Sequence, residues 1–263
     1  MIADVSLPLR LLKEYRKLSM RKFRNKNGKM ILEGNQLLEE ALSAGVTLES
    51  LIYTAQFASK PGAEGLITKI DKNRIFRVDT STFAKIAQTD TPQGVAAIAR
   101  IPEKQYDAFY KKGFFLILDR IQDPGNLGTI IRTAAAARVN GIILLEGTAD
   151  PYNPKALRAS MGGIFYVPIV SEVELPDWFD IMKRQGIQLI AADPGGNTAY
   201  YNVDFNMPSA VIIGNESRGV RKALLEKAEI KAFIPLHGKF NTLNAAVAAA
   251  AFVLENERQK NFQ

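Results

Sequence analysis

Three polar segments of this sequence combine residue types that could bind a ligand or take part in a reaction. The first, residues 122–134 (QDPGNLGTIIRTA), has a Pro-Gly-Asn turn and places Arg132 among small apolar residues. In the second, residues 212–219 (IIGNESRG), two glycines bracket four polar residues. The third, residues 234–250 (IPLHGKFNTLNAAVAAA), holds the only histidine, His237, shortly before an alanine-rich run. Polar loops of this kind are typical of sites that present backbone and side chains to a ligand.

Ionisation limits the chemistry that these side chains can perform. Arginine stays protonated under ordinary conditions, so Arg132 is better suited to hold an oxyanion or a phosphate than to accept a proton. His237, with an ordinary pKa near about 6.5, has the side chain of a general base, and the alternative is a plain loop histidine. The chain has no cysteine, which excludes disulfides and thiolate nucleophiles. With a single histidine as well, we expect no metal site.

Strands and helices alternate regularly around these three segments. The alternation predicts an α/β fold with a parallel sheet covered by helices on both faces. Ligands of such sheets bind at the carboxyl ends of the strands, where the three segments fall. Apolar runs predict strands at 114–119, 142–147, 164–170, 187–193, 210–214 and 230–236.

The N-terminal part of the sequence predicts a separate, smaller α/β unit. Its expected strands lie at 51–55, 74–78 and 94–101, with a helix that starts at Asp79-Thr80. The polar stretch 102–113 interrupts the pattern, so we expect a linker there between a domain at 1–101 and a domain at 114–263.

The net charge of +7 is concentrated in one short segment. Residues 10–29 hold nine Lys or Arg and one Glu, so the rest of the chain is nearly neutral. Clustered cations favour a nucleic-acid-binding surface, and a solvated basic helix is the alternative. The sequence has no apolar run of membrane-spanning length and no secretory leader pattern, so we expect a cytoplasmic protein without membrane contact.

In order and spacing, the three polar segments resemble the motifs of the SpoU (TrmH-type) RNA 2′-O-ribose methyltransferases of the SPOUT superfamily. The stretch 158–163 (RASMGG) is similar to another one common in that family. Residues 30–42 (MILEGNQLLEEAL) and 46–54 (VTLESLIYT) resemble the L30e-like substrate-binding domain that is often fused to it.

The resemblance implies a C-terminal domain with a deep trefoil knot that binds S-adenosylmethionine. It implies transfer of the methyl group to a ribose 2′-OH of RNA, with ribosomal RNA favoured over transfer RNA because of the L30e-like domain. Family members are usually homodimers whose active sites are completed across the interface, so we expect a homodimer here.

Carried over motif by motif, the resemblance also assigns residues to roles. The cofactor would be bound by Gly214, Ile234, Leu236, Leu243 and Asn244. The catalytic set would be Asn126, Arg132, Glu216 and Asn244, with Arg132 as an electrostatic clamp. For RNA contacts, the basic segment and the RASMGG stretch supply Arg21, Lys22, Arg24, Lys26 and Arg158.

The third segment departs from the family pattern. The usual Ser-Leu-Asn-Val-Ser reads Thr-Leu-Asn-Ala-Ala here, so Thr242 keeps a hydroxyl and Ala246 does not. An RNA-binding protein with a catalytically silent SPOUT domain is therefore an alternative, as is a methyltransferase of transfer RNA. A nicotinamide-dependent oxidoreductase is a third, because Glu146 ends a strand 21 residues after Gly125, although no Gly-x-Gly-x-x-Gly is present.

Overall fold

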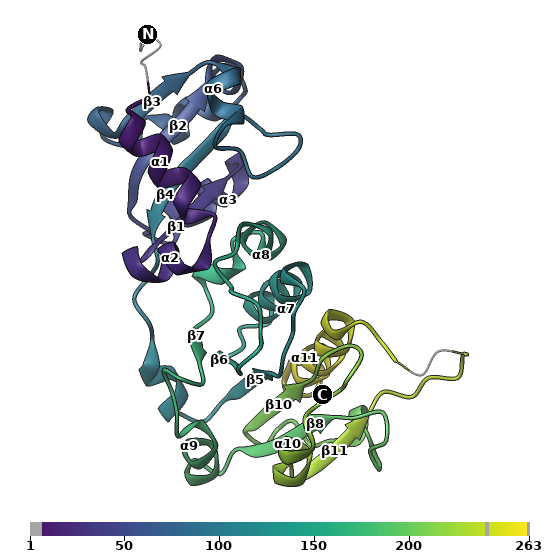
Figure 1. Cartoon of the computed structure of the whole chain (residues 1–263). Helices are drawn as coiled ribbons and strands as arrows, with labels where there is room; N and C mark the ends of the chain where they lie inside the picture. Colours follow the sequence, from purple (N-terminus) through teal and green to yellow (C-terminus); the bar gives the residue numbers. More distant parts are fainter. Residues whose placement is uncertain (1–6, 240–241, 262–263) are drawn as a thin grey trace. The chain divides into compact units, whose positions relative to one another are not determined.

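The computed structural model describes residues 7–239 and 242–261, and the chain divides into two compact units (Figure 1). The first unit comprises Met1–Glu103 and Tyr152–Phe165, and the second comprises Lys104–Pro151 and Tyr166–Gln263. The segment Tyr152–Phe165, which the sequence-based division left in the C-terminal domain, therefore groups with the first unit. Its helix α8 (Pro154–Ser160) packs against strand β1 (Lys29–Glu33).

The first unit is built on a mixed four-stranded sheet in the order β1-β4-β2-β3. Strand β4 pairs antiparallel with β1 and β2, and β2 pairs parallel with β3. The sequence predicted three of these strands and missed β1, which is a short run before the Gly34-Asn35 turn. The other strands are β2 (Leu48–Thr54), β3 (Ile75–Val78) and β4 (Val95–Arg100).

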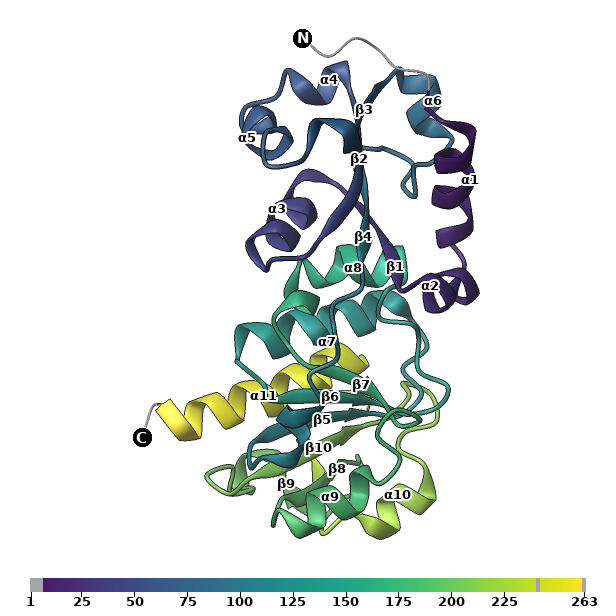
Figure 2. The ribbon, with the colours of Figure 1, turned by 90° about the vertical axis from the view of Figure 1, so that its left-hand side faces the viewer.

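Helices cover both faces of this sheet (Figure 2). On one face, Tyr15 and Leu18 of α1 and Phe83 of α6 are buried against sheet residues such as Ile52. Asp79 caps α6 by accepting a hydrogen bond from the backbone N–H of Thr82, as the sequence predicts. The helices are α1 (Leu9–Leu18), α2 (Arg21–Asn27), α3 (Asn35–Ser43), α4 (Ala55–Ala58), α5 (Ala63–Ile67) and α6 (Thr80–Ala84).

The second unit contains a seven-stranded sheet in the order β7-β6-β5-β10-β8-β11-β9, and all its strand pairs are parallel. The predicted parallel sheet is therefore confirmed. The central strands β5 and β10 are buried along their whole length, which explains their continuous apolar runs. The strands are β5 (Phe114–Leu118), β6 (Gly141–Leu144), β7 (Ile169–Ser171), β8 (Gln188–Ala192), β9 (Thr198–Ala199), β10 (Ser209–Ile213) and β11 (Ile230–Phe233).

The strand predicted at 164–170 is wrong over most of its length. Residues Gly163–Phe165 form a 3-10 turn, and only Ile169–Ser171 pairs with β6.

Helices α7 and α11 lie on one face of the large sheet, and α9 and α10 lie on the other (Figures 1 and 2). Their bounds are α7 (Pro124–Ala136), α9 (Trp178–Arg184), α10 (Lys222–Lys227) and α11 (Ala245–Asn261). Among the described residues, no helix combines the length and the apolarity needed to cross a membrane.

Candidate active site

The loops after the central parallel strands of the second unit surround a partly open pocket. The pocket is formed where β8, β10 and β11 end, because parallel strands bring their carboxyl ends to one edge of the sheet. The lining residues are Ala192, Asp193, Pro194, Ile213, Gly214, Asn215, Glu216, Gly219, Ala232, Phe233, Ile234, Leu236, Leu243, Ala245, Ala248 and Phe252.

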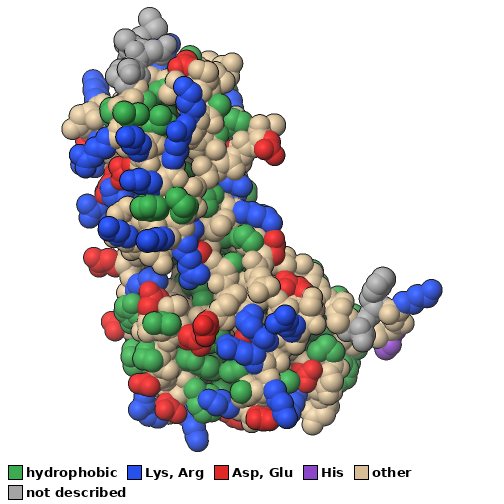
Figure 3. All heavy atoms as spheres, in the orientation of Figure 1, with side chains coloured by type: hydrophobic (Ala, Val, Ile, Leu, Met, Phe, Trp, Pro, Cys, Tyr) green, Lys and Arg blue, Asp and Glu red, His purple; other side chains and the backbone are tan. Residues whose placement is uncertain are grey.

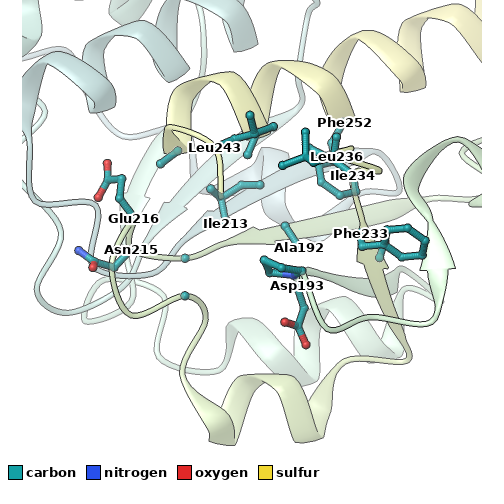
Figure 4. Close-up of a pocket in the computed structure, with 16 residues that line it drawn as sticks. Ala192, Asp193, Ile213, Asn215, Glu216, Phe233, Ile234, Leu236, Leu243 and Phe252 are labelled. Atoms are coloured by element: carbon teal, nitrogen blue, oxygen red, sulfur yellow. The ribbon is translucent and has the colours of Figure 1, made fainter. Parts of the chain in front are cut away.

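The predicted cofactor residues largely converge on this pocket (Figure 4). Gly214, Ile234, Leu236 and Leu243 line it, while Asn244 does not and lies beside it. Figure 4 shows the apolar side chains of Ile234, Leu236 and Leu243 on the α11 side of the pocket. Phe240 and Asn241 of the same predicted loop lie outside the described residues.

The sequence-based prediction missed the contribution of helix α11 to the pocket. Ala245, Ala248 and Phe252 follow each other at intervals of three and four residues, so they share one helix face, and all three line the cavity. This spacing is visible in the sequence and could have indicated that one face of the helix lines a cavity. The alanines are small because larger side chains at these positions would occupy the pocket.

Three residues from the three polar segments form a continuous chain of hydrogen bonds at the edge of this pocket. The side-chain amide of Asn126 donates to Glu216 Oε1 at 2.5 Å, and the side-chain amide of Asn244 donates to Asn126 Oδ1 at 3.0 Å. Asn244 Oδ1 in turn accepts from the backbone N–H of Ala246 and so caps α11. The structure thus brings together three of the four predicted catalytic residues.

Local sequence explains how Asn126 is held. Asp123 accepts a hydrogen bond from the Asn126 backbone N–H and caps α7, and Pro124 occupies the first helical turn, where its missing N–H costs nothing. The first turn of α7 therefore fixes the Asn126 side chain toward Glu216.

The fourth predicted catalytic residue, Arg132, lies away from the pocket. It is exposed on α7 and is not among the residues that line the cavity. Arg132 lies six positions after Asn126 on α7, which is not a whole number of helical turns, so the two side chains leave the helix in different directions. His237, the rival base, is exposed in the loop after β11 and does not line the cavity either. Ala246, which stands where the family pattern has a serine, is buried and does not line the cavity. The serine hydroxyl that it lacks would therefore not be part of the pocket wall.

The structure corrects one member of the predicted RNA-binding set. Arg24 is only 2% exposed, and its guanidinium donates hydrogen bonds to the carbonyls of Leu18 and Ser19, so it joins α1 to α2 instead of facing solvent. Arg21, Lys22 and Lys26 are exposed, and Arg158 is half-buried in the first unit.

The exposed basic surface extends further along α1 than the predicted residues. Arg10, Lys13 and Lys17 are exposed and lie on one face of α1, at intervals of three and four residues. They line an open hollow together with Leu9, Glu14, Asn27 and Lys29. Figure 3 shows Lys and Arg side chains gathered over α1 and α2. We call the surface formed by six exposed cations the basic face: Arg10, Lys13, Lys17, Arg21, Lys22 and Lys26.

A parallel α/β sheet with an apolar pocket and polar loops at its carboxyl edge gives the second unit the architecture of a domain that binds a small ligand at this edge. Sequence comparison gives the particular family. Residues 113–254 match the SpoU rRNA methylase family, and residues 10–97 match the MRM3-like substrate binding domain. The chain belongs to the SpoU rRNA methylase family.

Individual relatives agree with this assignment. The chain is 36% identical over 242 residues to the 23S rRNA (guanosine(2553)-2′-O)-methyltransferase of Bacillus subtilis, covering 92% of this chain and 93% of that protein. It is similar to the AdoMet-bound rRNA methyltransferase of Sinorhizobium meliloti, with a TM-score of 0.84, 31% identity and 98% of each chain covered.

The SpoU methyltransferase AviRb of Streptomyces viridochromogenes, in complex with AdoMet, gives a TM-score of 0.84 at 28% identity, with 97% of this chain and 98% of that chain covered. The predicted class, an S-adenosylmethionine-dependent RNA ribose 2′-O-methyltransferase, is confirmed. The oxidoreductase alternative finds no support in these comparisons.

Proposed function

We propose that this protein transfers the methyl group of S-adenosylmethionine to a ribose 2′-OH of 23S ribosomal RNA. The observation that carries the proposal is the hydrogen-bonded chain Asn244–Asn126–Glu216 at the rim of the apolar pocket. It places polar groups from all three motifs beside the site where a nucleoside cofactor fits. The relative in Bacillus subtilis, whose name specifies 23S rRNA, supports the choice of substrate.

The pocket has the chemistry that this cofactor needs. An adenine ring favours apolar walls, which Ile213, Leu236 and Leu243 supply. Two acidic residues, Asp193 and Glu216, are also among those that line the pocket, and negative charge nearby suits a ligand whose net charge is positive because of its sulfonium. When bound, S-adenosylmethionine supplies an electrophilic methyl group.

The residues of the chain would act on the ribose hydroxyl. Methylation forms a bond from the 2′-oxygen to the methyl carbon and releases the hydroxyl proton, so the oxygen gains negative charge before the bond is complete. A permanently charged guanidinium stabilises that charge, which is the role we assign to Arg132. Asn126 fixes the position of Glu216 through its amide, and Glu216 is one of the residues that line the pocket.

The exposure of Arg132 supports a homodimer in which this arginine serves the pocket of the partner. Within one chain, Arg132 does not line the pocket. Helix α11 packs against α7 and exposes Val247 (54%) and Leu254 (60%), two apolar side chains seven residues apart on one helix face. Exposed apolar residues at this spacing suit a helix–helix contact between subunits.

We also assign a trefoil knot to the second unit and an L30e-like fold to the first. The sheet order supports the knot. Strand β11 lies beyond β8, yet the following helix α11 returns to pack against α7 and β10. The chain therefore crosses back over the central strands after β11.

In the first unit, the basic face is the surface that we assign to RNA. Its six exposed cations can neutralise phosphates, and few acidic groups lie among them. Glu14, the one acidic residue of the segment, is occupied by Lys29 at 2.7 Å. Since ribosomal RNA is the proposed substrate, the protein would act in the cytoplasm.

The decisive experiment uses 23S ribosomal RNA isolated from cells that lack this gene. Incubation with the purified protein and S-adenosylmethionine should add a 2′-O-methyl group at one nucleotide, found by mapping alkali-resistant linkages. Binding of cofactor and RNA without methylation would instead establish the catalytically silent alternative. Methylation of transfer RNA alone would move the substrate to the other RNA class.

A further inference from the structure

A buried carboxylate lies directly behind the loop that carries Glu216. Asp119 follows strand β5 and is 0% exposed. Its Oδ1 lies 2.7 Å from Arg221 Nε and 3.3 Å from Arg120 Nε, and its Oδ2 accepts the backbone N–H of Arg221 at 2.8 Å. One carboxylate thus holds two arginines, of which Arg221 ends the loop 214–221.

The neighbouring residue ties down the start of the same loop. Arg120 has a φ of 59°, a left-handed conformation that costs a non-glycine residue about 1–2 kcal/mol. The backbone N–H of Arg120 donates to Thr148 Oγ1 at 3.1 Å, and its carbonyl accepts from the side-chain amide of Asn215 at 3.1 Å. Its guanidinium also donates to the Gly219 carbonyl at 3.3 Å. Both ends of the loop are therefore anchored to the end of β5.

The loop itself has little freedom once its ends are fixed. The side-chain oxygen of Asn215 accepts from the backbone N–H groups of Ser217 and Arg218, and the Gly219 N–H donates to the Asn215 carbonyl. A Cβ at Gly214 would come within 2.2 Å of the Gly219 backbone, so the two ends touch. Glu216 lies inside this closed turn, and its place depends on the two anchors.

Stability alone does not account well for such a cluster. A buried ion pair costs desolvation about as large as its Coulomb gain, so an apolar cluster of the same volume would be as stable. A charged cluster does fix one arrangement of its partners, and a strained residue held by several bonds is typical of functional sites. Four residues of the anchored loop, Gly214, Asn215, Glu216 and Gly219, line the pocket.

We propose that Asp119 is a positioning residue that holds the loop 214–221, and with it Glu216, in the conformation that binds the cofactor and accepts the ribose. It acts through Arg120 and Arg221 and touches neither substrate nor cofactor. The proposal rests on the proposed methyltransferase function, but its first test measures only the binding of S-adenosylhomocysteine, which the cofactor becomes when it loses its methyl group.

The first test is the dissociation constant of S-adenosylhomocysteine for Asp119→Asn, measured by calorimetry. Asparagine keeps the shape and the bond to the Arg221 N–H but removes the charge that holds the guanidinium groups. We expect the constant to rise about tenfold, because four residues of the pocket wall move. The matched control is Glu255→Gln, which removes a buried carboxylate (7% exposed) paired with Arg258 away from the loop, and it should leave the constant unchanged.

The second test separates positioning from general destabilisation. With 23S ribosomal RNA, Asp119→Asn should lower kcat about tenfold or more in the wild-type background but less than about threefold in a Glu216→Ala background, since residues that act as a unit are not additive. Arg221→Gln should reproduce the affinity loss even if Asp119→Asn folds poorly. Unchanged S-adenosylhomocysteine affinity in both variants, or an equal loss in Glu255→Gln, would overturn the proposal, whereas failure of methylation in the wild type would overturn only the proposed function.

Discussion

The side-chain amide nitrogen of Asn244 lies 3.0 Å from the amide oxygen of Asn126, although 118 positions separate the two residues in the sequence. Asn126 in turn donates a hydrogen bond from its side-chain amide to Glu216, which lies 90 positions further along the sequence. These two hydrogen bonds restrict the residue type at position 126, because Asn126 must donate to a carboxylate and accept from an amide at the same time. An uncharged amide side chain does both, whereas a carboxylate only accepts and an ammonium group only donates.

Replacing Asn126 by Asp should therefore be nearly as harmful as replacing it by Ala. An aspartate keeps the acceptor for Asn244 but places a second negative charge against Glu216. We expect kcat to fall about 100-fold in Asn126→Asp, with a smaller change in cofactor affinity. The Gln185→Ala variant, which changes a polar residue at the end of α9, serves as the control. Wild-type turnover in Asn126→Asp would show that the hydrogen-bonded chain has no catalytic role.

The sequence located the polar loops around the pocket better than it located the exposed cations of the first unit. Glycine-bracketed polar loops after apolar strands can be located from composition alone, and parallel strands must bring such loops to one edge. The burial of Arg24 could not be predicted, because it depends on the direction in which one turn of α2 meets the carbonyls at the end of α1. Strand β1 was missed for a related reason. Its five residues gain their structure by pairing with β4, which lies more than 60 positions later.

Arg132 provides a test of the dimer. If Arg132 completes the pocket of the partner, mixing the variants Arg132→Ala and Glu216→Ala, each with strongly reduced kcat on its own, should restore activity. Half of the dimers are then mixed, and one of the two sites in each is intact, so about one quarter of wild-type kcat is expected. An arginine that acts within its own chain gives no intact site in any mixture. Each variant measured alone supplies the baseline, and a mixture that stays at that baseline would exclude the shared site.

The basic face should determine how RNA binding responds to salt. Changing Lys13 and Lys17 together to Gln removes up to two phosphate contacts, so the slope of log affinity against log salt should fall by about one to two. The double change Lys111→Gln/Lys112→Gln removes the same charge from exposed positions outside this face and should leave the slope unaltered. Equal slopes for the two double variants would mean that the basic face is merely solvated.

Arg24 should behave differently from its neighbours on α2. Arg24→Ala leaves buried carbonyls without their donor, so we expect a loss of about 1–3 kcal/mol in the free energy of unfolding. The change Lys22→Ala, at an exposed position, should stay within about 0.5 kcal/mol. Chemical denaturation of the two variants tests this directly. Comparable stabilities would show that the Arg24 contacts contribute nothing.

Tyr15 should make the first unit sensitive to alkali. Burial raises the pKa of its phenol well above the ordinary value, because the phenolate would be desolvated. The folded state therefore favours the protonated phenol, and its contribution to stability is complete below about pH 10 and is lost progressively as the pH rises above it. Tyr15→Phe keeps the ring in the core, loses the bonds to Ser50 and the Ala96 carbonyl, and should unfold with a weaker pH dependence between about pH 10 and 12. Parallel alkaline denaturation curves for the two proteins would contradict this.

Ala248 of α11 should control whether the cofactor can enter the pocket. Ala248 lines the pocket from within a helix that also carries Ala245 and Phe252 on the same face. A leucine at position 248 would project its branched side chain into the space where the cofactor fits, while the backbone of α11 keeps its helical conformation, since leucine is nearly as good a helix former as alanine. We expect the dissociation constant of S-adenosylmethionine to rise about 100-fold for Ala248→Leu with little change in melting temperature. The same substitution two positions along, Ala250→Leu, changes a half-buried residue that does not line the pocket and should bind the cofactor normally. If both variants bind equally well, α11 is not a wall of the cofactor site, and its small side chains must serve packing alone.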